Sequence, residues 1–171
     1  SANAKNGAGD SYVIFGGASL PSTINLASLG TAGVTIFGAD EYDKSGRSVS
    51  SAGDVNGDGL ADLIVGAHNS DPTAGADAGR SYVVFGRTSG TAIDLSAVAV
   101  GSGGFVINGQ CAGDGSGYSV SNAGDVNGDG LADLVACPPG WGCEINIEHH
   151  LDAYGLREHF NPIKAAYSAS M

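Results

Sequence analysis

The chain has 171 residues, which is enough for one ordinary domain with a hydrophobic core. Its formal net charge is −11, with 7 Lys and Arg against 18 Asp and Glu. This balance argues against nucleic acid or an anionic membrane surface as a partner, because both attract a basic protein surface. The 29 glycines indicate many tight turns, and a hydrophobic content of 42% argues against a disordered chain. No apolar run approaches the roughly 18 residues that a membrane span needs.

An internal repeat organises the chain. Residues 46–63 read GRSVSSAGDVNGDGLADL, and residues 117–134 read GYSVSNAGDVNGDGLADL, so the two copies differ at only two positions. A second pair precedes and separates them, since SYVIFG at 11–16 recurs as SYVVFG at 81–86. Two segments that recur at nearly the same offset of about 70 residues indicate a duplicated structural unit.

The apolar segments of each unit are short and rich in β-branched or aromatic residues. They are bounded by Gly, Asp, Asn or Ser, which is typical of strands. No segment before residue 140 keeps a helical apolar period over the roughly 10–12 residues that identify a helix. We therefore expect an all-β fold with about four antiparallel strands per unit, as in a β-propeller blade, with a solenoid or a sandwich as the alternative. The expected strands lie near 11–15, 34–38, 47–51, 61–66, 81–85, 105–109, 118–122 and 132–136.

The units predict an incomplete propeller. One full unit spans about 39–109, and partial blades span 1–38 and 110–136. A propeller needs roughly four to eight blades to close. The start of the chain within the repeat pattern suggests a processed or excised fragment. Because repeat units bury their apolar faces only against neighbours, we expect neighbouring blades of an intact protein as partners, or association of the fragment.

Each copy of the repeat contains the loop D-x-N-x-D-G-x-x-D, which places side-chain oxygens at positions one, three, five and nine. Calcium takes about six to eight oxygen ligands from such groups, and a divalent cation relieves the repulsion among three carboxylates on one small loop. An Asp/Asn/Gly turn without metal is the alternative. The predicted ligands of the first calcium ion are Asp54, Asn56, Asp58, Asp62 and the Leu60 carbonyl; those of the second are Asp125, Asn127, Asp129, Asp133 and the Leu131 carbonyl.

Three better-known calcium modules share the opening of this loop, and each fits poorly. An EF-hand needs a bidentate Glu at position twelve and flanking helices, whereas position twelve is Val65 in one loop and Ala136 in the other. A dockerin-type module also continues into a helix. Thrombospondin-type calcium repeats are much shorter than the unit found in this chain.

The whole unit resembles the FG-GAP repeat of integrin α-chain β-propellers and their bacterial relatives, over residues 1–136. Phe15-Gly16 and Phe85-Gly86 match the "FG" of the motif, and Gly66-Ala67 stands where "GAP" falls, with His68 in place of its Pro. The resemblance implies a β-propeller with calcium held between adjacent strands of a blade. It also implies an extracellular or cell-surface setting.

From this resemblance we expect a calcium-binding β-propeller repeat module that acts in adhesion or in binding a protein or carbohydrate ligand, with calcium as a structural staple. The alternative is an accessory propeller segment of an extracellular hydrolase or lyase, because similar propellers occur in phospholipases and polysaccharide lyases. The chain contains no G-x-S-x-G elbow, no H-E-x-x-H and no Walker loop, so we predict that it is not an enzyme.

The repeat ends abruptly after the second loop. The first copy reads DLIVGA at 62–67, whereas the second reads DLVACPPGW at 133–141. We interpret residues 137–171 as a divergent tail, frameshifted or disordered, with irregular or partly helical structure. Because the strand after the second loop runs into Pro138 and Pro139, the first calcium site is the better supported of the two.

Overall fold

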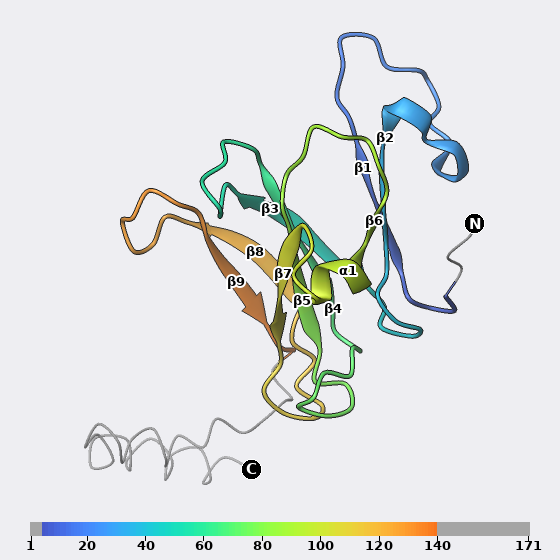
Figure 1. Ribbon diagram of the computed structural model, residues 1–171. Coiled ribbons are helices and arrows are strands. Elements are labelled where there is room, and N and C mark those ends of the chain that lie inside the picture. The colour runs from blue at the N-terminus through green and yellow to red at the C-terminus, as the bar shows by residue number, and fades with distance from the viewer. Residues whose placement is uncertain (1–4, 140–171) are drawn as a thin grey trace, which may run out of the picture.

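The computed structural model describes residues 5–139, so most of the predicted tail lies outside the described residues. The described part is built from strands in three sheets (Figure 1). None of its helices is long and apolar enough to cross a membrane. The strands are β1 (Asp10–Ile14), β2 (Gly33–Phe37), β3 (Ser48–Gly53), β4 (Asp62–Ala67), β5 (Arg80–Val84), β6 (Ile93–Asp94), β7 (Gly104–Asn108), β8 (Ser119–Gly124) and β9 (Asp133–Cys137).

The fold is that of incomplete β-propeller blades, as the repeat predicted. The central sheet has the strand order β3-β4-β5-β7, with every neighbouring pair antiparallel, and so forms one complete four-stranded blade. All eight expected strands are present, with ends shifted by one or two residues. The two-residue strand β6, the five-residue helix α1 (Leu95–Ala99) and two single-turn 3-10 helices (Leu26–Ser28 and Gly30–Ala32) were not expected.

The other two sheets each repeat one half of the central blade. β1 pairs with β2 as β5 pairs with β7, with Tyr12 opposite Thr35 in one pair and Tyr82 opposite Val106 in the other. β8 pairs with β9 as β3 pairs with β4, and both hairpins have a register shift just before their last pair. β6 adds a short parallel pairing to β2. Residues 5–139 therefore contain the last two strands of one blade, a complete blade, and the first two strands of a third.

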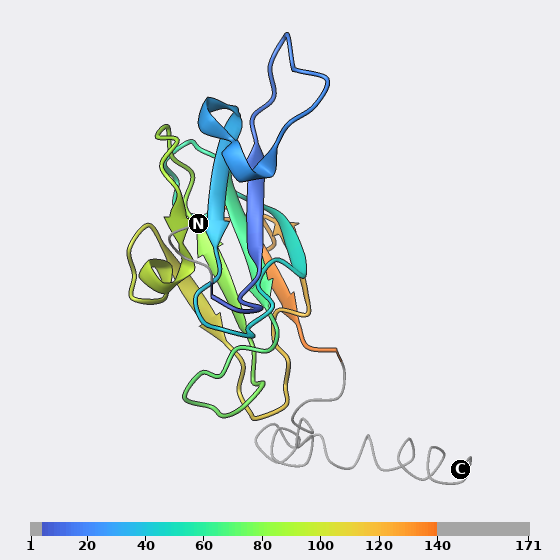
Figure 2. The same ribbon diagram turned by 90° about the vertical axis from the view of Figure 1, so that its right-hand side faces the viewer.

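The core lies between the sheets, which stand side by side and run in nearly the same direction (Figures 1 and 2). Side chains alternate between the two faces of a strand. Val65 and Tyr82 therefore join a cluster with Ile36 of the first sheet, whereas Ile64 joins a cluster with Val120 of the third. The middle strands of the blade are buried on both faces, which explains why their sequences read as almost continuous apolar runs.

Backbone contacts join neighbouring blades at repeated positions. The Ser116 amide donates to the Ala78 carbonyl at 2.9 Å, and one repeat earlier the Ser45 amide donates to the Ala8 carbonyl at 2.7 Å. In each case the alanine that accepts the bond is followed by a glycine in the left-handed region. Gly79, which follows Ala78, has φ +80°. A Cβ on Gly79 would lie 2.2 Å from the Ser116 carbonyl oxygen. Glycine is therefore required where two blades approach this closely.

Replacing the inter-blade glycine should destabilise the fold. Gly79→Ala forces a side chain into the left-handed region and against backbone, so we expect a loss of about 2–4 kcal/mol in the free energy of unfolding, measured by urea denaturation. Gly90→Ala is the matched control, because an added Cβ there meets nothing within 4 Å. Equal stability of the two variants would contradict this account of the blade contact.

Candidate metal centre

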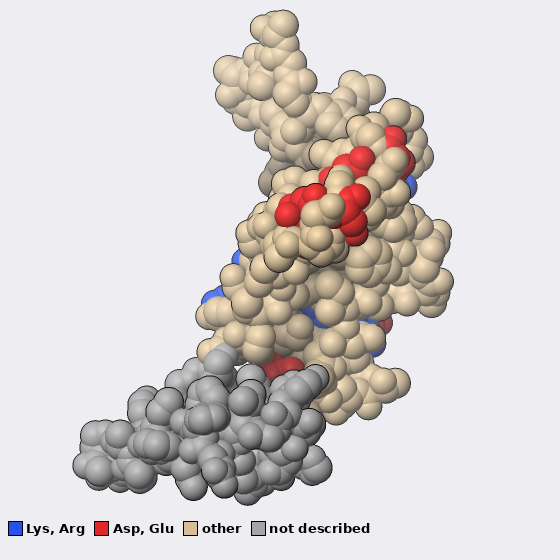
Figure 3. All heavy atoms as spheres, turned by 90° about the vertical axis from the view of Figure 1, so that its left-hand side faces the viewer, with Lys and Arg blue, Asp and Glu red and all other residues tan. Residues whose placement is uncertain are grey.

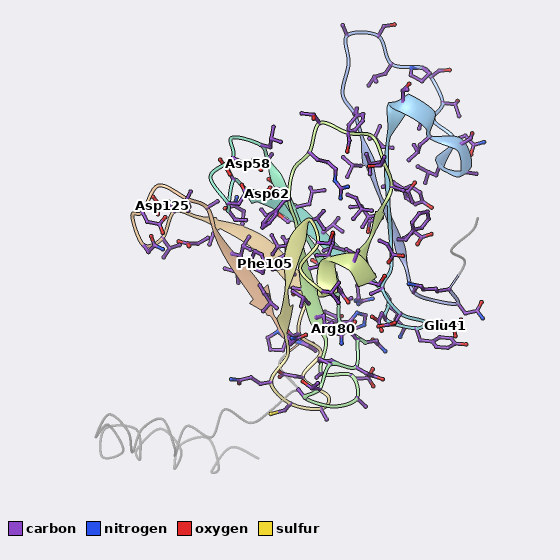
Figure 4. All side chains as sticks on the ribbon, viewed as in Figure 1. Glu41, Asp58, Asp62, Arg80, Phe105 and Asp125 are labelled. Carbon is purple, nitrogen blue, oxygen red and sulfur yellow. The ribbon has the colours of Figure 1, made fainter. Side chains whose placement is uncertain are left out.

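The two acidic loops connect the first and second strands of successive blades. One joins β3 to β4 and the other joins β8 to β9. They lie side by side, because the amide of Ala132 in the second loop donates to the carbonyl of Asp54 in the first at 3.1 Å. Figure 4 shows Asp58, Asp62 and Asp125 at this end of the molecule, and Figure 3 shows acidic side chains gathered in a band on one face.

The first loop wraps around the carboxylate of its first residue. Asp54 accepts hydrogen bonds from the amides of Gly57, Asp58 and Gly59 at 2.8, 3.1 and 2.9 Å. The amide of Asp58 also donates to Asn56 Oδ1 at 3.0 Å. Gly57 and Gly59 both have positive φ, which gives the chain the tight turns that bring these amides to one carboxylate.

Asp62 connects the loop to the rest of the blade. It is the first residue of β4 and is fully buried. One carboxylate oxygen accepts from the Val55 amide at 2.9 Å, and the other accepts from the Gly86 amide at 2.7 Å. Gly86 is the glycine of the "FG" sequence and follows β5. The two parts of the motif that recur together in the sequence are thus joined by one carboxylate.

The second loop has the same local geometry with weaker anchoring. Asp125 accepts from the amides of residues 128, 129 and 130 at 2.7, 3.1 and 2.9 Å. Asp133 accepts from Val126 at 2.7 Å and Asn127 at 3.3 Å, both within the loop. It is only half-buried, because β9 has no further strand paired to its outer edge within residues 5–139. The first loop is therefore the more firmly anchored of the two.

The structure brings the predicted ligands into one loop each without converging their carboxylates on a common point. Within residues 5–139, no group of three or more His, Cys, Asp or Glu side chains could hold a metal ion as arranged. The carboxylates bind backbone amides instead. The two described salt bridges, Lys5–Asp94 and Arg80–Asp40, involve none of the six loop aspartates. Leu60 and Leu131, the predicted carbonyl ligands, lie partly exposed in their loops.

The types of donor nevertheless fit calcium. Each ionised carboxylate has about four lone-pair sites, so an oxygen that accepts one amide can also bind a cation. Each loop offers three carboxylates, one side-chain amide oxygen and backbone carbonyls, which are the hard oxygen donors that calcium prefers. The residues present therefore match the ion in chemistry.

A second polar cluster lies between the blades at the other end of the strands. The Arg47 guanidinium stacks 4.5 Å from the centre of the Tyr118 ring and donates to its hydroxyl at 2.6 Å. His68 packs edge-on against the same ring, with the ring centres 5.4 Å apart. Burial lowers the pKa of His68, and the positive charges of Arg47 and Lys44 lower it further. The histidine is therefore neutral near pH 7.

A neighbouring buried group has its carboxylate held by a hydroxyl. Ser70 Oγ donates to Asp43 at 2.5 Å. Burial raises the pKa of Asp43, although the Ser70 bond opposes this effect. Burial also raises the pKa of Tyr82. Burial lowers the pKa of Arg80, but the hydrogen bond to Tyr82 and the negative charges of nearby groups, Asp43 and Asp40 among them, together outweigh this effect, so the net pKa is raised.

Comparison with known proteins supports the family resemblance. The family model of the FG-GAP repeat matches residues 45–84 and 116–138. The chain is 33% identical over 107 residues to integrin alpha pat-2 of Caenorhabditis elegans, a match that covers 60% of this chain and 8% of the integrin. The FG-GAP and integrin α resemblance is thereby confirmed.

The chain is also similar to proteins of a second kind. It is 51% identical over 45 residues to the glycine betaine-binding periplasmic protein OusX of Dickeya dadantii (strain 3937), which covers 26% of this chain and 14% of that protein. It is 51% identical over 47 residues to the glycine betaine/proline betaine-binding periplasmic protein of Escherichia coli (strain K12), with 28% and 14% covered. The chain thus spans a small part of the length of every relative named here.

The buried aspartate should matter more than its counterpart in the next blade. In chelator, Asp62→Ala leaves the amides of Val55 and Gly86 without their acceptor, so we expect a loss of about 3–5 kcal/mol in the free energy of unfolding. Asp133→Ala removes bonds that lie within a half-exposed loop, and we expect a loss of about 1–2 kcal/mol. Urea denaturation in chelator measures both values, and an equal or reversed order would contradict the anchoring role of Asp62.

The inter-blade histidine should make stability depend on pH. Because the pKa of His68 is lower in the folded state, the unfolded chain binds more protons below about pH 6.5, so stability is full above that pH and falls as the solution is acidified. His68→Gln should flatten the fall in melting temperature between about pH 7 and pH 5.5. An unchanged slope in that variant would show that His68 does not carry the effect.

Proposed function

We propose that this β-propeller chain, whose residues 45–84 and 116–138 are FG-GAP repeats, is a calcium-stabilised binding module of a cell-surface or secreted protein. Calcium acts as a structural staple in the loops between the first and second strands of each blade. The module serves adhesion or ligand binding and carries out no catalysis. Its ligand is a protein or a carbohydrate.

The observation that carries the calcium proposal is the position of Asp62. This buried carboxylate belongs to the predicted ligand set and also binds the Gly86 amide after β5, so the charge of the loop is fixed inside the blade. Asp54 and Asp58 add two more carboxylates within the same nine residues. A charge density of this kind in a partly buried loop favours a divalent cation, since like charges at short range repel strongly.

The second loop adds three more carboxylates to the same region of the molecule. Because the Ala132 amide binds the Asp54 carbonyl, the two acidic loops lie side by side. Acidic side chains gather in a band on one face of the molecule (Figure 3). When bound, calcium supplies positive charge that neutralises the carboxylates. Asp54, Asn56, Asp58, Asp62 and the Leu60 carbonyl would hold the first ion. Their positions along a loop already ordered by amide bonds keep the cost of ordering the ligands low.

We assign the binding surface to the long connections between strands. The segments 15–32 and 85–103 link the third and fourth strands of successive blades, and the first of them extends beyond the sheets at one end (Figure 2). Leu20 and Leu26 in the first of these are exposed. Surface connections on a rigid scaffold vary freely and commonly carry recognition. A setting outside the cytoplasm agrees with the relatives that are named as periplasmic.

Calcium should stabilise the folded chain. A metal that binds only the folded state raises stability by mass action, by about 2.7 kcal/mol per site at a free concentration one hundred times the dissociation constant. We therefore expect a higher melting temperature in calcium than in chelator. Asp58→Ala and Asp129→Ala should each remove one site in a calorimetric or terbium titration and should each reduce the calcium-dependent shift.

Glu41→Ala is the matched control, because it removes one negative charge from an exposed position distant from both loops (Figure 4). It should leave the number of sites and the calcium-dependent shift unchanged. Identical melting in calcium and chelator for the unmodified chain would overturn the calcium proposal, and loss of a site in the control would show that the binding is non-specific.

A further inference from the structure

The two half-blades of the chain are complementary halves of one blade. β8 and β9 correspond to β3 and β4, the first two strands of the complete blade. β1 and β2 correspond to β5 and β7, its last two strands. Placing β9 beside β1 would therefore reproduce the order of the central sheet. Within one copy, the complete blade lies between these two strands (Figure 1).

The same repeat positions are buried in the complete blade and exposed at the two open ends. Val84 in β5 is 1% exposed, whereas its counterpart Ile14 in β1 is 39% exposed. Ile64 in β4 is fully buried, whereas its counterpart Val135 in β9 is 43% exposed. These apolar side chains stand at the positions where the complete blade has its core.

A third position shows that no hairpin of the described residues covers β3. Val120 in β8 packs against the complete blade and is 6% exposed, and its amide donates to Ser48 Oγ at 3.0 Å. Its counterpart Val49 in β3 is 57% exposed. A cleft of about 620 Å³ lies next to it, lined by β1 on one side and by β3 and β4 on the other. This is the place that a first-and-second-strand hairpin would occupy.

The outer edge of β1 is free to pair among the described strands. The amide of Phe15 donates to the Ala32 carbonyl, so Phe15 and Val13 direct their backbone groups toward β2. In an antiparallel pair alternate residues bond to opposite sides. The backbone groups of Tyr12 and Ile14 therefore face the open edge, as those of Tyr82 and Val84 face β4 in the complete blade.

We propose that the β8–β9 hairpin of one copy docks on β1 of a second copy and completes a four-stranded blade between them. The register follows from the β4–β5 pair, in which Leu63 lies opposite Val84 and Val65 opposite Tyr82. We call this pairing of β9 with the second copy's β1 the joint. In the joint, Leu134 lies opposite the second copy's Ile14, and Ala136 lies opposite its Tyr12. The same docking buries Val135 and the second copy's Val49 against each other.

This contact is heterologous, because it uses a different surface on each copy, and such contacts produce either closed rings or open filaments. The described residues 5–139 of each copy contribute one complete blade and two halves, which amounts to two blades. A propeller closes with roughly four to eight blades. Two, three or four copies would therefore form a ring of the usual size.

One residue of the hairpin opposes the joint. Cys137 occupies the repeat position of Gly66, where an added Cβ would lie 1.9 Å from the Gly117 carbonyl oxygen of the next blade. In the joint, the corresponding carbonyl is that of the second copy's Gly46. The end of β9 must therefore move away from its neighbour, which weakens the association. Cys137→Gly should tighten the association by roughly tenfold or more.

The test measures the mass of the full chain by analytical ultracentrifugation over a wide range of protein concentration. The unmodified chain should associate, and Cys137→Gly should associate at lower concentration. Ile14→Pro should block the accepting edge, because it removes an amide that faces the joint and leaves the bonds to β2 intact. Val135→Glu should block the docking hairpin. Leu20→Pro, in an exposed connection, is the control and should associate normally.

Mixing the two blocked variants distinguishes this joint from any symmetric association. Ile14→Pro retains an intact hairpin and Val135→Glu retains an intact edge, so each alone should be monomeric and the mixture should form a dimer with one joint and nothing larger. A dimer in the mixture also shows that both variants are folded. A monomeric unmodified chain at every concentration, or association that neither variant alters, would overturn the proposal.

Discussion

The structure depends on one constraint, which is that the middle strands of a blade are apolar on both faces and must be covered by blades on both sides. Ile64 and Val65 are adjacent in β4, yet they belong to two different cores, one shared with each neighbouring sheet. No single blade can satisfy both. The duplication of the sequence, the glycines at the blade contacts and the exposed apolar residues at the two ends all follow from this need for neighbours.

Duplication also explains how much of the fold could be predicted from the sequence. Two signals predict these strands. They contain β-branched and aromatic residues between turn residues, and they recur at a fixed spacing. β6 and α1 were not predicted from the sequence, because neither is long enough to show a hydrophobic period. The helix is capped by the Asp94 side chain, which accepts a hydrogen bond from the Ser96 amide, and Leu95 and Val98 are buried in the core.

The acidic loops were predictable in composition and position, but their contacts were not. A spacing rule locates Asp62 as the last residue of the loop, and it says nothing of Gly86, which lies 24 residues further along the chain. Only the pairing of β4 with β5 brings the two together. The signal was present in the sequence, because the FG pair and the loop recur together. The same pairing explains why Asp62 is more deeply buried than Asp133.

The order of the acidic loops is coupled to the contacts between blades. The bond from the Ala132 amide to the Asp54 carbonyl joins the loops of neighbouring blades, and Gly53, just before Asp54, packs against Ala132 as well. Whatever orders the first loop therefore also positions its neighbour. A cation held by Asp54 would stabilise a blade and the contact between blades together, and by linkage, docking of a further blade would raise the affinity of the loop for the cation.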